Sequence, residues 1–383
     1  MSSWYQRFAF SLVKGFYVPR LISRYSVRFT GNDKEPAEPH LLIANHQHMD
    51  DSYVLARHMA SPVRAMADRE ASSALQLALG KLLGLYFRRP GVDDTALIRQ
   101  TKSFLNEGHS VGIFPSGAMS WDGRDEIDFL QTAKLAKLLR VPFRMARISG
   151  LYLAKPRWAE SARVTEVGVH WTMLQAMEVR EMKAGELAGR IRDALAHDEV
   201  RSLRGAEVQG GKLAEGIHNL IWHCPSCNGH NGIHGVGNEI LCGRCGGGWV
   251  LRGDLSLPDG PFADIVSWHD WQIGRLSEQI AADEDGDFPR LDTTGAALIS
   301  HDQRSPRRNR NVVREVRAEY RNGEMHVSGN GTHGISFPLG SVRAPRILKN
   351  RSFCFSHGEQ RFQLEAPGQN LLKWLCMARR LSR

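Results

Sequence analysis

Residues 45–51 read NHQHMDD and directly follow the apolar run LLIA of residues 41–44. A short apolar run bounded by polar residues is typical of a buried strand. Two histidines and two aspartates after such a strand exceed what stability alone requires, because binding and catalytic groups concentrate on loops that a rigid element positions. The stretch therefore predicts a chemical site at the end of a strand.

The same strand signal recurs along the first 200 residues and alternates with helical periodicity. Strands are expected at 41–44, 111–114 and 141–148, and helices at 51–60, 70–86, 94–107, 128–140 and 183–196. This alternation predicts an α/β domain with a mostly parallel sheet flanked by helices.

Length and charge limit the classes of protein to consider. The 383 residues suffice for two or three domains, and the formal net charge of +9 favours acidic partners such as anionic lipid, nucleic acid or phosphorylated metabolites. No apolar run reaches the roughly 20 residues of a transmembrane helix. Because Arg7 and Lys14 interrupt the amino-terminal apolar segment, a secretory signal is also disfavoured, and we expect an intracellular protein.

The amino terminus has the pattern of an amphipathic helix. One face carries large apolar residues at every fourth position, namely Trp4, Phe8, Leu12 and Phe16. Arg7 and Lys14 fall on the other side, and the first 30 residues contain no acid. Such a helix either packs on the core or lies in a membrane interface, and the aromatic and purely basic composition favours the interface.

NHQHMDD admits three interpretations. His46, His48 and Asp50 match the HxHxD start of the metallo-β-lactamase signature, but Asp51 stands where that signature needs another histidine. Alternatively, Asp50 or Asp51 caps the next helix, which leaves His46 unexplained. The third interpretation is a catalytic dyad in which Asp51 orients His46 by holding one ring nitrogen. The other nitrogen then acts as a general base.

The third interpretation is supported by further motifs in the same order as in a known family. NHQHMDD resembles the NHxxxxD box of the glycerolipid acyltransferases, the PlsC-type or lysophosphatidic acid acyltransferase-like family. Residues 86–89, YFRR, resemble that family's FxxR-like block, and residues 113–117, IFPSG, followed by Asp122-Gly123, resemble its FPEGTRS block and DG turn. The resemblance covers about residues 5–200.

The resemblance implies an O-acyltransferase that moves a fatty acyl group from acyl-CoA or acyl-carrier protein to a lysophospholipid-like or other lipid hydroxyl. It implies His46 and Asp51 as the catalytic pair. The implied substrate-binding residues are Asn45, Arg89, Phe114, Pro115, Ser116 and Gly117. Ser116 replaces the family's glutamate, and Ala118-Met119 replace its Thr-Arg pair, so the acceptor can differ from glycerol phosphate.

Two CxxC pairs indicate a metal site later in the chain. Cys224, Cys227, Cys242 and Cys245 have the spacing of a four-cysteine zinc ribbon. Disulfides are the alternative, and a reducing compartment disfavours them. Because four thiolates close the coordination sphere, we expect the Zn²⁺ to be structural.

The sequence thus predicts three parts: an acyltransferase-like domain at 1–205 with its amphipathic helix, a zinc ribbon at 218–253, and a β-rich module at 257–383 that ends in a helix. We expect a cytoplasmic enzyme of phospholipid biosynthesis, peripheral at the inner face of the membrane. Its expected partners are membrane lipid, the acyl donor and a protein bound through the ribbon, with no nucleic acid. The alternative is a non-catalytic membrane adaptor in which a degenerate acyltransferase domain binds lipid.

Overall fold

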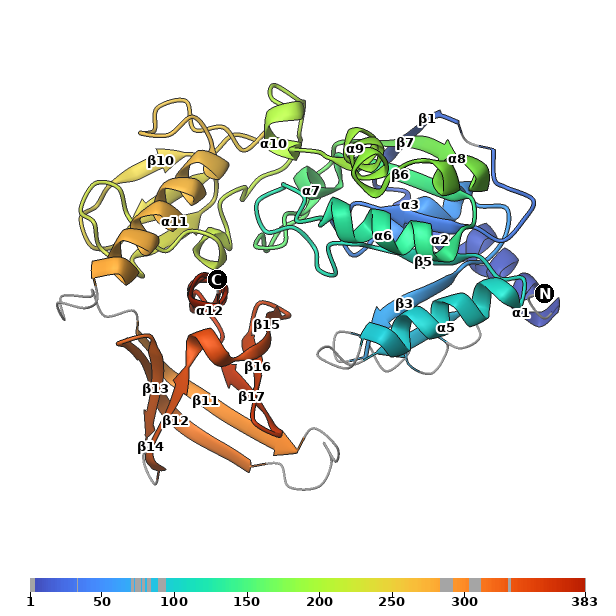
Figure 1. The fold of residues 1–383 in the computed structure, drawn as a ribbon. Coiled ribbons are helices and arrows are strands. Elements are labelled where there is room, and N and C mark those ends of the chain that lie inside the picture. The colour runs from blue at the N-terminus through green and yellow to red at the C-terminus, as the bar shows by residue number, and fades with distance from the viewer. Residues whose placement is uncertain are drawn as a thin grey trace. The chain divides into compact units, whose positions relative to one another are not determined.

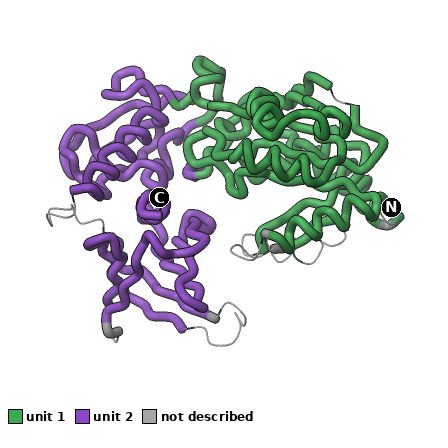
Figure 2. Tube along the Cα trace, in the orientation of Figure 1, with its two compact units in different colours: residues 1–157, 162–210, 253–255 green, residues 158–161, 211–252, 256–383 purple. Residues whose placement is uncertain are grey.

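The computed structural model describes residues 4–32, 34–69, 72, 77, 80, 84–88, 94–282, 292–302, 311–329 and 332–382. The chain forms two compact units (Figure 2). Unit 1 comprises residues 1–157, 162–210 and 253–255, and unit 2 comprises residues 158–161, 211–252 and 256–383.

Unit 1 is built on a seven-stranded sheet with the order β1-β7-β6-β2-β5-β3-β4 (Figure 1). The strands are β1 Ser26–Gly31, β2 Leu41–Ala44, β3 Arg64–Asp68, β4 Leu85–Arg88, β5 Val111–Ile113, β6 Phe143–Ser149 and β7 Glu166–Leu174. All neighbours pair in parallel except β6 and β7. The predicted α/β class with a mostly parallel sheet is confirmed.

Helices cover both faces of this sheet, which explains why β2 is apolar at every position. Leu41 and Ile43 pack in one buried cluster with residues of α6 (Phe129–Leu139) and α9 (Ala184–Leu195). Leu42 and Ala44 point to the opposite face and pack in a second cluster with α3 (Asp51–His58). Continuous apolar runs are typical of parallel strands buried on both faces.

Further helices of unit 1 are α5 Asp94–Asn106, α7 Leu151–Ala154, α8 Ala176–Glu181 and α10 Glu199–Ser202. The expected helices at 51–60, 94–107, 128–140 and 183–196 are therefore confirmed. The expected helix at 70–86 lies mostly outside the described residues, and its last two positions, Leu85 and Tyr86, belong to β4. That part of the prediction was wrong because short apolar runs read alike as helix or strand.

A helical segment precedes the sheet. It consists of α1 Trp4–Leu12, a π-helical turn at Val13–Tyr17 and α2 Val18–Ile22. In the turn Val18 donates its N–H to the carbonyl of Val13, immediately before Pro19, which has no N–H to continue an α-helical ladder. In the described part of the chain, no helix has both the length and the apolar character to cross a membrane.

Unit 2 contains two antiparallel sheets. The smaller one has the order β10-β9-β8 and consists of β8 Ile233–Val236, β9 Glu239–Cys242 and β10 Gly248–Val250. The larger has the order β14-β13-β12-β11-β17-β16-β15. Its strands are β11 Asp292–Asp302, β12 Asn311–Arg321, β13 Glu324–Gly329, β14 Thr332–Pro338, β15 Arg343–Leu348, β16 Ser352–His357 and β17 Gln360–Glu365. The predicted β-rich region ending in a helix is confirmed, since α12 spans Leu372–Leu381.

Residues in or near two helices of unit 2 form hydrogen bonds to residues 218–231, the segment that precedes the small sheet. In α11 (Ile265–Ala281), Trp268 donates its indole N–H to the carbonyl of His223 at 2.9 Å. Near α12, Asn370 donates to the carbonyl of His218, and Lys373 Nζ lies 3.1 Å from Asn231 Oδ1. The segment that contains the cysteines is therefore stabilised both by α11, which precedes the larger sheet in the chain, and by residues in or near α12, which follows it.

Candidate active site

The site begins where β2 ends, and Asn45 fixes this end of the strand. Its amide donates to the carbonyl of Ile148 at 2.8 Å and accepts the N–H of Ile148 at 2.7 Å. Asn45 is fully buried. The amide thus ties the turn after β2 to the neighbouring strand β6, which favours a structural role for a residue expected to bind substrate.

His46 and Asp51 form the centre of the site. The Nδ1 atom of His46 lies 2.8 Å from Oδ2 of Asp51. The same oxygen accepts the backbone N–H groups of Gln47 at 2.7 Å and His48 at 3.0 Å. Asp51 is fully buried, whereas the His46 side chain keeps 21% of its surface exposed. The hydrogen bond places the proton on Nδ1 and leaves Nε2 as the basic nitrogen.

Phe114, just after β5, packs on the histidine ring. The two ring centroids are 4.2 Å apart and the planes are inclined by 16°. The carbonyl of His46 also accepts the N–H of Ser120 at 2.9 Å. Because β2 and β5 are parallel neighbours, their carboxyl ends meet, and the expected residues from two motifs converge at one edge of the sheet.

The turn at Pro115, Ser116 and Gly117 follows directly. Gly117 has φ +69°, and a Cβ atom there would have no atom within 4 Å. Ser116 donates its hydroxyl to the carbonyl of Ala118 at 3.0 Å, and Gly117 donates its N–H to the carbonyl of Phe114. The turn is closed by its own hydrogen bonds, and an exposed glycine lets a substrate approach the backbone closely.

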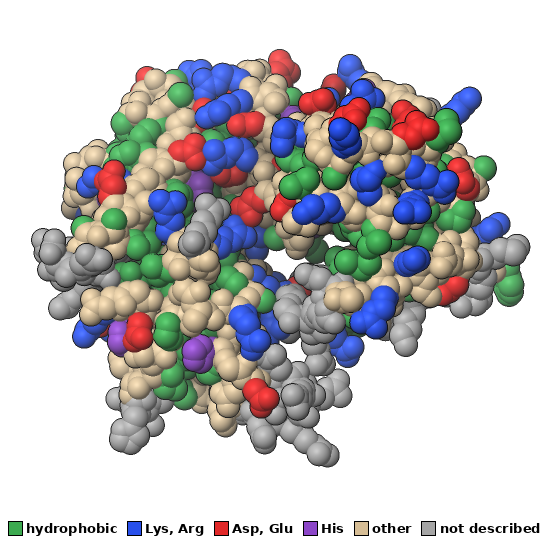
Figure 3. All heavy atoms as spheres, viewed as in Figure 1, with side chains coloured by type: hydrophobic (Ala, Val, Ile, Leu, Met, Phe, Trp, Pro, Cys, Tyr) green, Lys and Arg blue, Asp and Glu red, His purple; other side chains and the backbone are tan. Residues whose placement is uncertain are grey.

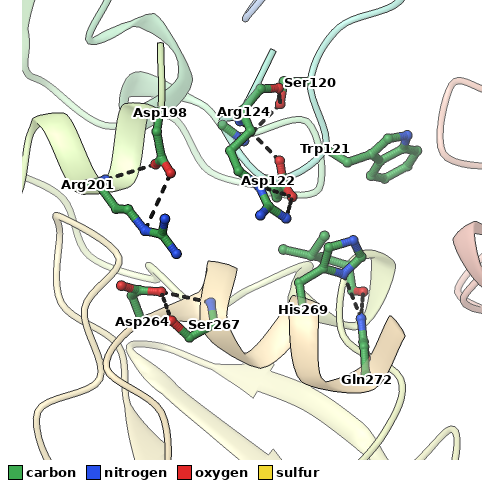
Figure 4. Close-up of polar contacts among 12 residues, drawn as sticks. Ser120, Trp121, Asp122, Arg124, Asp198, Arg201, Asp264, Ser267, His269 and Gln272 are labelled. Atoms are coloured by element: carbon green, nitrogen blue, oxygen red, sulfur yellow. Dashed lines mark hydrogen bonds and ion pairs between the residues drawn. The ribbon is translucent and has the colours of Figure 1, made fainter. Parts of the chain in front are cut away.

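A second turn lies at Ser120–Arg124 and is closed by its own hydrogen bonds (Figure 4). Ser120 Oγ donates to the carbonyl of Arg124 at 2.7 Å and accepts the N–H of Gly123 at 2.9 Å. Asp122 accepts from both the backbone and the guanidinium Nε of Arg124, each at 3.0 Å. Gly123 has φ +88° and lies against Tyr152, so this position requires glycine.

The other acid and histidine of NHQHMDD face the amino-terminal segment. Asp50 accepts hydrogen bonds from Tyr25 Oη at 2.8 Å and from the guanidinium of Arg24. Burial, and then the hydrogen bond to Asp50, raises the pKa of Tyr25 well above its usual range. Burial lowers the pKa of His48, which accepts the N–H of Asp50 on Nδ1 at 3.0 Å. Neither aspartate caps α3 through a side-chain bond to its first N–H groups.

The metal-hydrolase interpretation finds no support here. Among the described residues, only Cys224, Cys227, Cys242 and Cys245 come together as three or more potential metal ligands. His46 pairs with Asp51, whereas His48 and Asp50 contact each other, so the three side chains do not form one ligand set. Arg89, expected to bind the acceptor, lies outside the residues that the structure describes.

The four cysteines form a compact site in unit 2. Their Sγ atoms all lie within 4.8 Å of one another, and the Cys224–Cys245 and Cys227–Cys242 pairs are 3.8 and 3.9 Å apart. A tetrahedral ion with Zn–S bonds of about 2.3 Å separates its sulfurs by about 3.8 Å. The cluster fits Zn²⁺ in size and donor type.

The turns that carry these cysteines share one backbone feature. The residue after the second cysteine of each pair is left-handed, at Asn228 with φ +52° and at Gly246 with φ +75°. Asparagine and glycine are the residues that adopt this conformation most readily. The sequence therefore builds two equivalent turns that direct four thiols to one point.

Comparisons with known proteins identify the domain that contains the dyad. Residues 26–145 match the family model for Acyltransferase. The match includes β1 to β5 and every described residue of the site from Asn45 to Gly117. The matched region contains the His46–Asp51 pair, and the resemblance seen in NHQHMDD is confirmed.

A solved structure with a similar fold is the 1-acyl-sn-glycerophosphate (LPA) acyltransferase PlsC from Thermotoga maritima. It is 16% identical, with a TM-score of 0.43, and the match covers 50% of this chain and 78% of that chain. No curated protein sequence matches the chain.

Two site residues were not expected from the sequence. Gln47 is fully buried and donates its side-chain amide to Asp125 Oδ1 at 3.3 Å. Gln47 occupies a variable position of the NHxxxxD box, and Asp125 is 78 residues away. Only the folded structure brings them together.

Proposed function

We propose that this protein is a membrane-associated O-acyltransferase. It moves a fatty acyl group from acyl-CoA or acyl-carrier protein to the hydroxyl of a lysophospholipid-like or other lipid acceptor. The observation that carries the proposal is the His46–Asp51 hydrogen bond of 2.8 Å inside an acyltransferase domain. The proposed acceptor is not restricted to a glycerol phosphate, because Ser116 occupies the position of the family's glutamate.

The dyad supplies the proton transfers. His46 Nε2 removes the proton of the acceptor hydroxyl as its oxygen attacks the thioester carbonyl carbon. The tetrahedral intermediate collapses, the C–S bond breaks, and the thiolate receives the proton from His46, so the products are an ester and a free thiol. Asp51 stabilises the imidazolium between these steps and fixes its tautomer.

Exposed apolar side chains at the amino terminus support membrane association. Trp4 is 79% exposed, Phe16 is 73% exposed and Phe8 is 58% exposed, so the apolar face of α1 and the following turn is not part of the core. Arg7, Lys14 and Arg20 accompany them without any acid. A helix with these features binds at the interface of an anionic bilayer, and we propose a peripheral location at the cytoplasmic face of the membrane.

The basic excess is better assigned to lipid than to nucleic acid. Figure 3 shows Lys and Arg side chains scattered over the visible face with acids among them. In contrast, residues 4–20 combine Arg7, Lys14 and Arg20 with exposed aromatic side chains on a single segment. A protein partner of the cysteine-containing segment remains part of the proposal, and its Zn²⁺ is proposed to be structural.

The second candidate function is the non-catalytic membrane adaptor. Ser116 favours it, because its hydroxyl bonds to the carbonyl of Ala118 and offers an acceptor headgroup no charge. The dyad and its stacking on Phe114 favour the enzyme.

Acceptor-dependent thiol release separates the two. Purified protein would be given acyl-CoA or acyl-carrier protein with a panel of lysophospholipids, glycerol phosphate and amino-acid lipids. Release by wild type that is lost in His46→Ala, with the variant still folded, establishes the enzyme and identifies its acceptor. Binding to anionic vesicles without release from any donor and acceptor pair would favour the adaptor.

A further inference from the structure

Gln47 holds the catalytic turn at two points. Its backbone N–H donates to Asp51 Oδ2 at 2.7 Å, and its side-chain Nε2 donates to Asp125 Oδ1 at 3.3 Å. Gln47 is fully buried. A shift of the Gln47 side chain therefore also moves its backbone N–H, which helps to orient Asp51. It also moves the neighbouring residue His46.

The contact between Gln47 and Asp125 is incomplete if the aspartate is ionised. Gln47 Oε1 and Asp125 Oδ2 are both inaccessible to solvent, and neither has a donor among the described residues. A buried acceptor without a donor costs about 1–3 kcal/mol. A carboxylate has no proton to offer, so the ionised form would leave both oxygens unsatisfied.

A protonated carboxyl removes both defects at once. An amide presents an N–H and a carbonyl side by side, and a carboxylic acid presents an acceptor oxygen and an O–H in the same arrangement. We propose that Asp125 is held as a neutral carboxylic acid that donates its proton to Gln47 Oε1. The resulting reciprocal pair makes Asp125 a positioning residue for the turn that carries His46.

The surroundings of Asp125 favour the neutral form. Burial first, and then the nearby carboxylates of Glu199 and Asp51, raise the pKa of Asp125 from the ordinary 3.8 to about 7. His197 opposes them through its ring and a backbone hydrogen bond. The imidazole of His197 lies 2.7 Å from Glu199 Oε2. Arg124, the neighbour of Asp125 in the chain, donates its guanidinium Nε–H to Asp122.

The proposal rests on the proposed function and gives it a pH dependence. Ionisation of Asp125 removes the donor to Gln47 Oε1 and places a second negative charge near Asp51. The pair then keeps the bond from Gln47 Nε2 but loses the second hydrogen bond, which leaves Gln47 Oε1 without a donor. The position of the turn is less well fixed, and acyl transfer falls as the pH rises through the pKa of Asp125.

The test compares Asp125→Asn with wild type and Asp125→Ala. An asparagine can both donate to Gln47 Oε1 and accept from Nε2, but it cannot ionise. We expect wild-type kcat/KM to fall by up to about tenfold per pH unit above neutral pH, as for one ionising group, until it reaches the level of Asp125→Ala. Asp125→Asn should match wild type within about threefold at pH 6 and lack this fall, whereas Asp125→Ala should be slow at every pH. An unchanged alkaline fall in Asp125→Asn would overturn the proposal.

Infrared spectroscopy provides a readout that needs no turnover. The difference between spectra at low and high pH, taken for wild type and for Asp125→Asn, isolates the C=O band of a protonated Asp125. A band that disappears near pH 7 in wild type and is missing from the variant supports the pair. A band that disappears near pH 4 overturns it. Absence of acyl transfer in wild type would count against the proposed function, and the infrared titration would still decide the protonation of Asp125.

Discussion

His46 Nδ1 and Asp51 Oδ2 lie 2.8 Å apart across the start of α3, and two backbone N–H groups share the same carboxylate oxygen. One buried atom therefore fixes both the imidazole tautomer and the path of the turn. Oδ2 of Asp51 does not need to reorganise when His46 takes a proton, because the three partners of this oxygen are already in place.

Removing either member of this pair should abolish most of the acyl transfer. We expect His46→Ala to lower kcat by at least about 10² to 10⁴, the usual contribution of a general base. Asp51→Asn should lower kcat by a similar factor, because a neutral amide stabilises the imidazolium poorly. The measurement is acceptor-dependent thiol release, with His326→Ala in β13 of unit 2 as a matched control that keeps full activity. Full activity in folded His46→Ala would refute the assignment.

Asn45 should matter for stability rather than for substrate affinity. Asn45→Ala removes both hydrogen bonds to Ile148 and leaves buried backbone groups unsatisfied. We expect a loss of about 2–4 kcal/mol in the free energy of unfolding, measured by urea denaturation. Asn106→Ala, at the exposed end of α5, is the control and should change little. A raised KM with unchanged stability would instead support the substrate-binding role.

The exposed face of α1 and the following turn should carry vesicle binding. Replacing Trp4 and Phe16 by serine should weaken binding to anionic vesicles at least tenfold, since a buried large apolar side chain contributes about 1.5–3 kcal/mol. Met177→Ser is a matched control, because Met177 is 66% exposed but lies in α8. Sedimentation with vesicles gives the affinity. Equal loss in the control would show that binding does not depend on the amino-terminal segment.

The cysteine cluster should hold about one zinc ion per chain. Elemental analysis should find this ratio in wild type and in Cys376→Ser, and a strongly reduced ratio in Cys227→Ser. Metal removal should also change the tryptophan fluorescence of unit 2. Metal binding at such sites is coupled to folding, and Trp249 packs edge-to-face on Trp268 of α11, so a loss of local structure changes the environment of both indoles. Zinc-free wild type with an unchanged spectrum would exclude a structural ion.

The local parts of the site could be predicted from the sequence, and the distant parts could not. His46 and Asp51 are five residues apart, so a strand-to-helix turn brings them together without any contact to distant parts of the chain. The contact between Gln47 and Asp125 depends on a loop 78 residues away. Neither residue has a pattern that reveals it before the sheet order is known.

Strands could likewise be predicted only where their own residues carry a local pattern. β2 was predicted from its apolar run, whereas β1 and β3 contain few fully buried side chains and give little signal. In β7 the buried residues Val167, Val169 and Trp171 alternate with less buried ones, a period that does indicate a strand. The antiparallel pairing of β7 with β6 follows only from the observed register.

The protonation of Asp125 also predicts how stability changes with pH. Its pKa is raised from 3.8 to about 7 in the folded protein, so the folded state binds the proton more tightly than the unfolded chain does. The stability gained from this proton is fully present below about pH 4 and is lost as the pH rises through about 7. The loss is on the order of 4 kcal/mol if the whole shift is effective.

Asp125→Asn tests this directly, because the variant has no proton to lose at that position. The difference in unfolding free energy between the variant and wild type should move in favour of the variant between pH 4 and pH 7 and be constant above about pH 8. Urea denaturation across this range provides the measurement. Asp128→Asn is a matched control, since this exposed aspartate caps α6 outside the buried pair and should show no comparable trend. A difference that does not vary with pH would mean that Asp125 is already ionised in the folded protein, and the catalytic turn would then need another donor for Gln47.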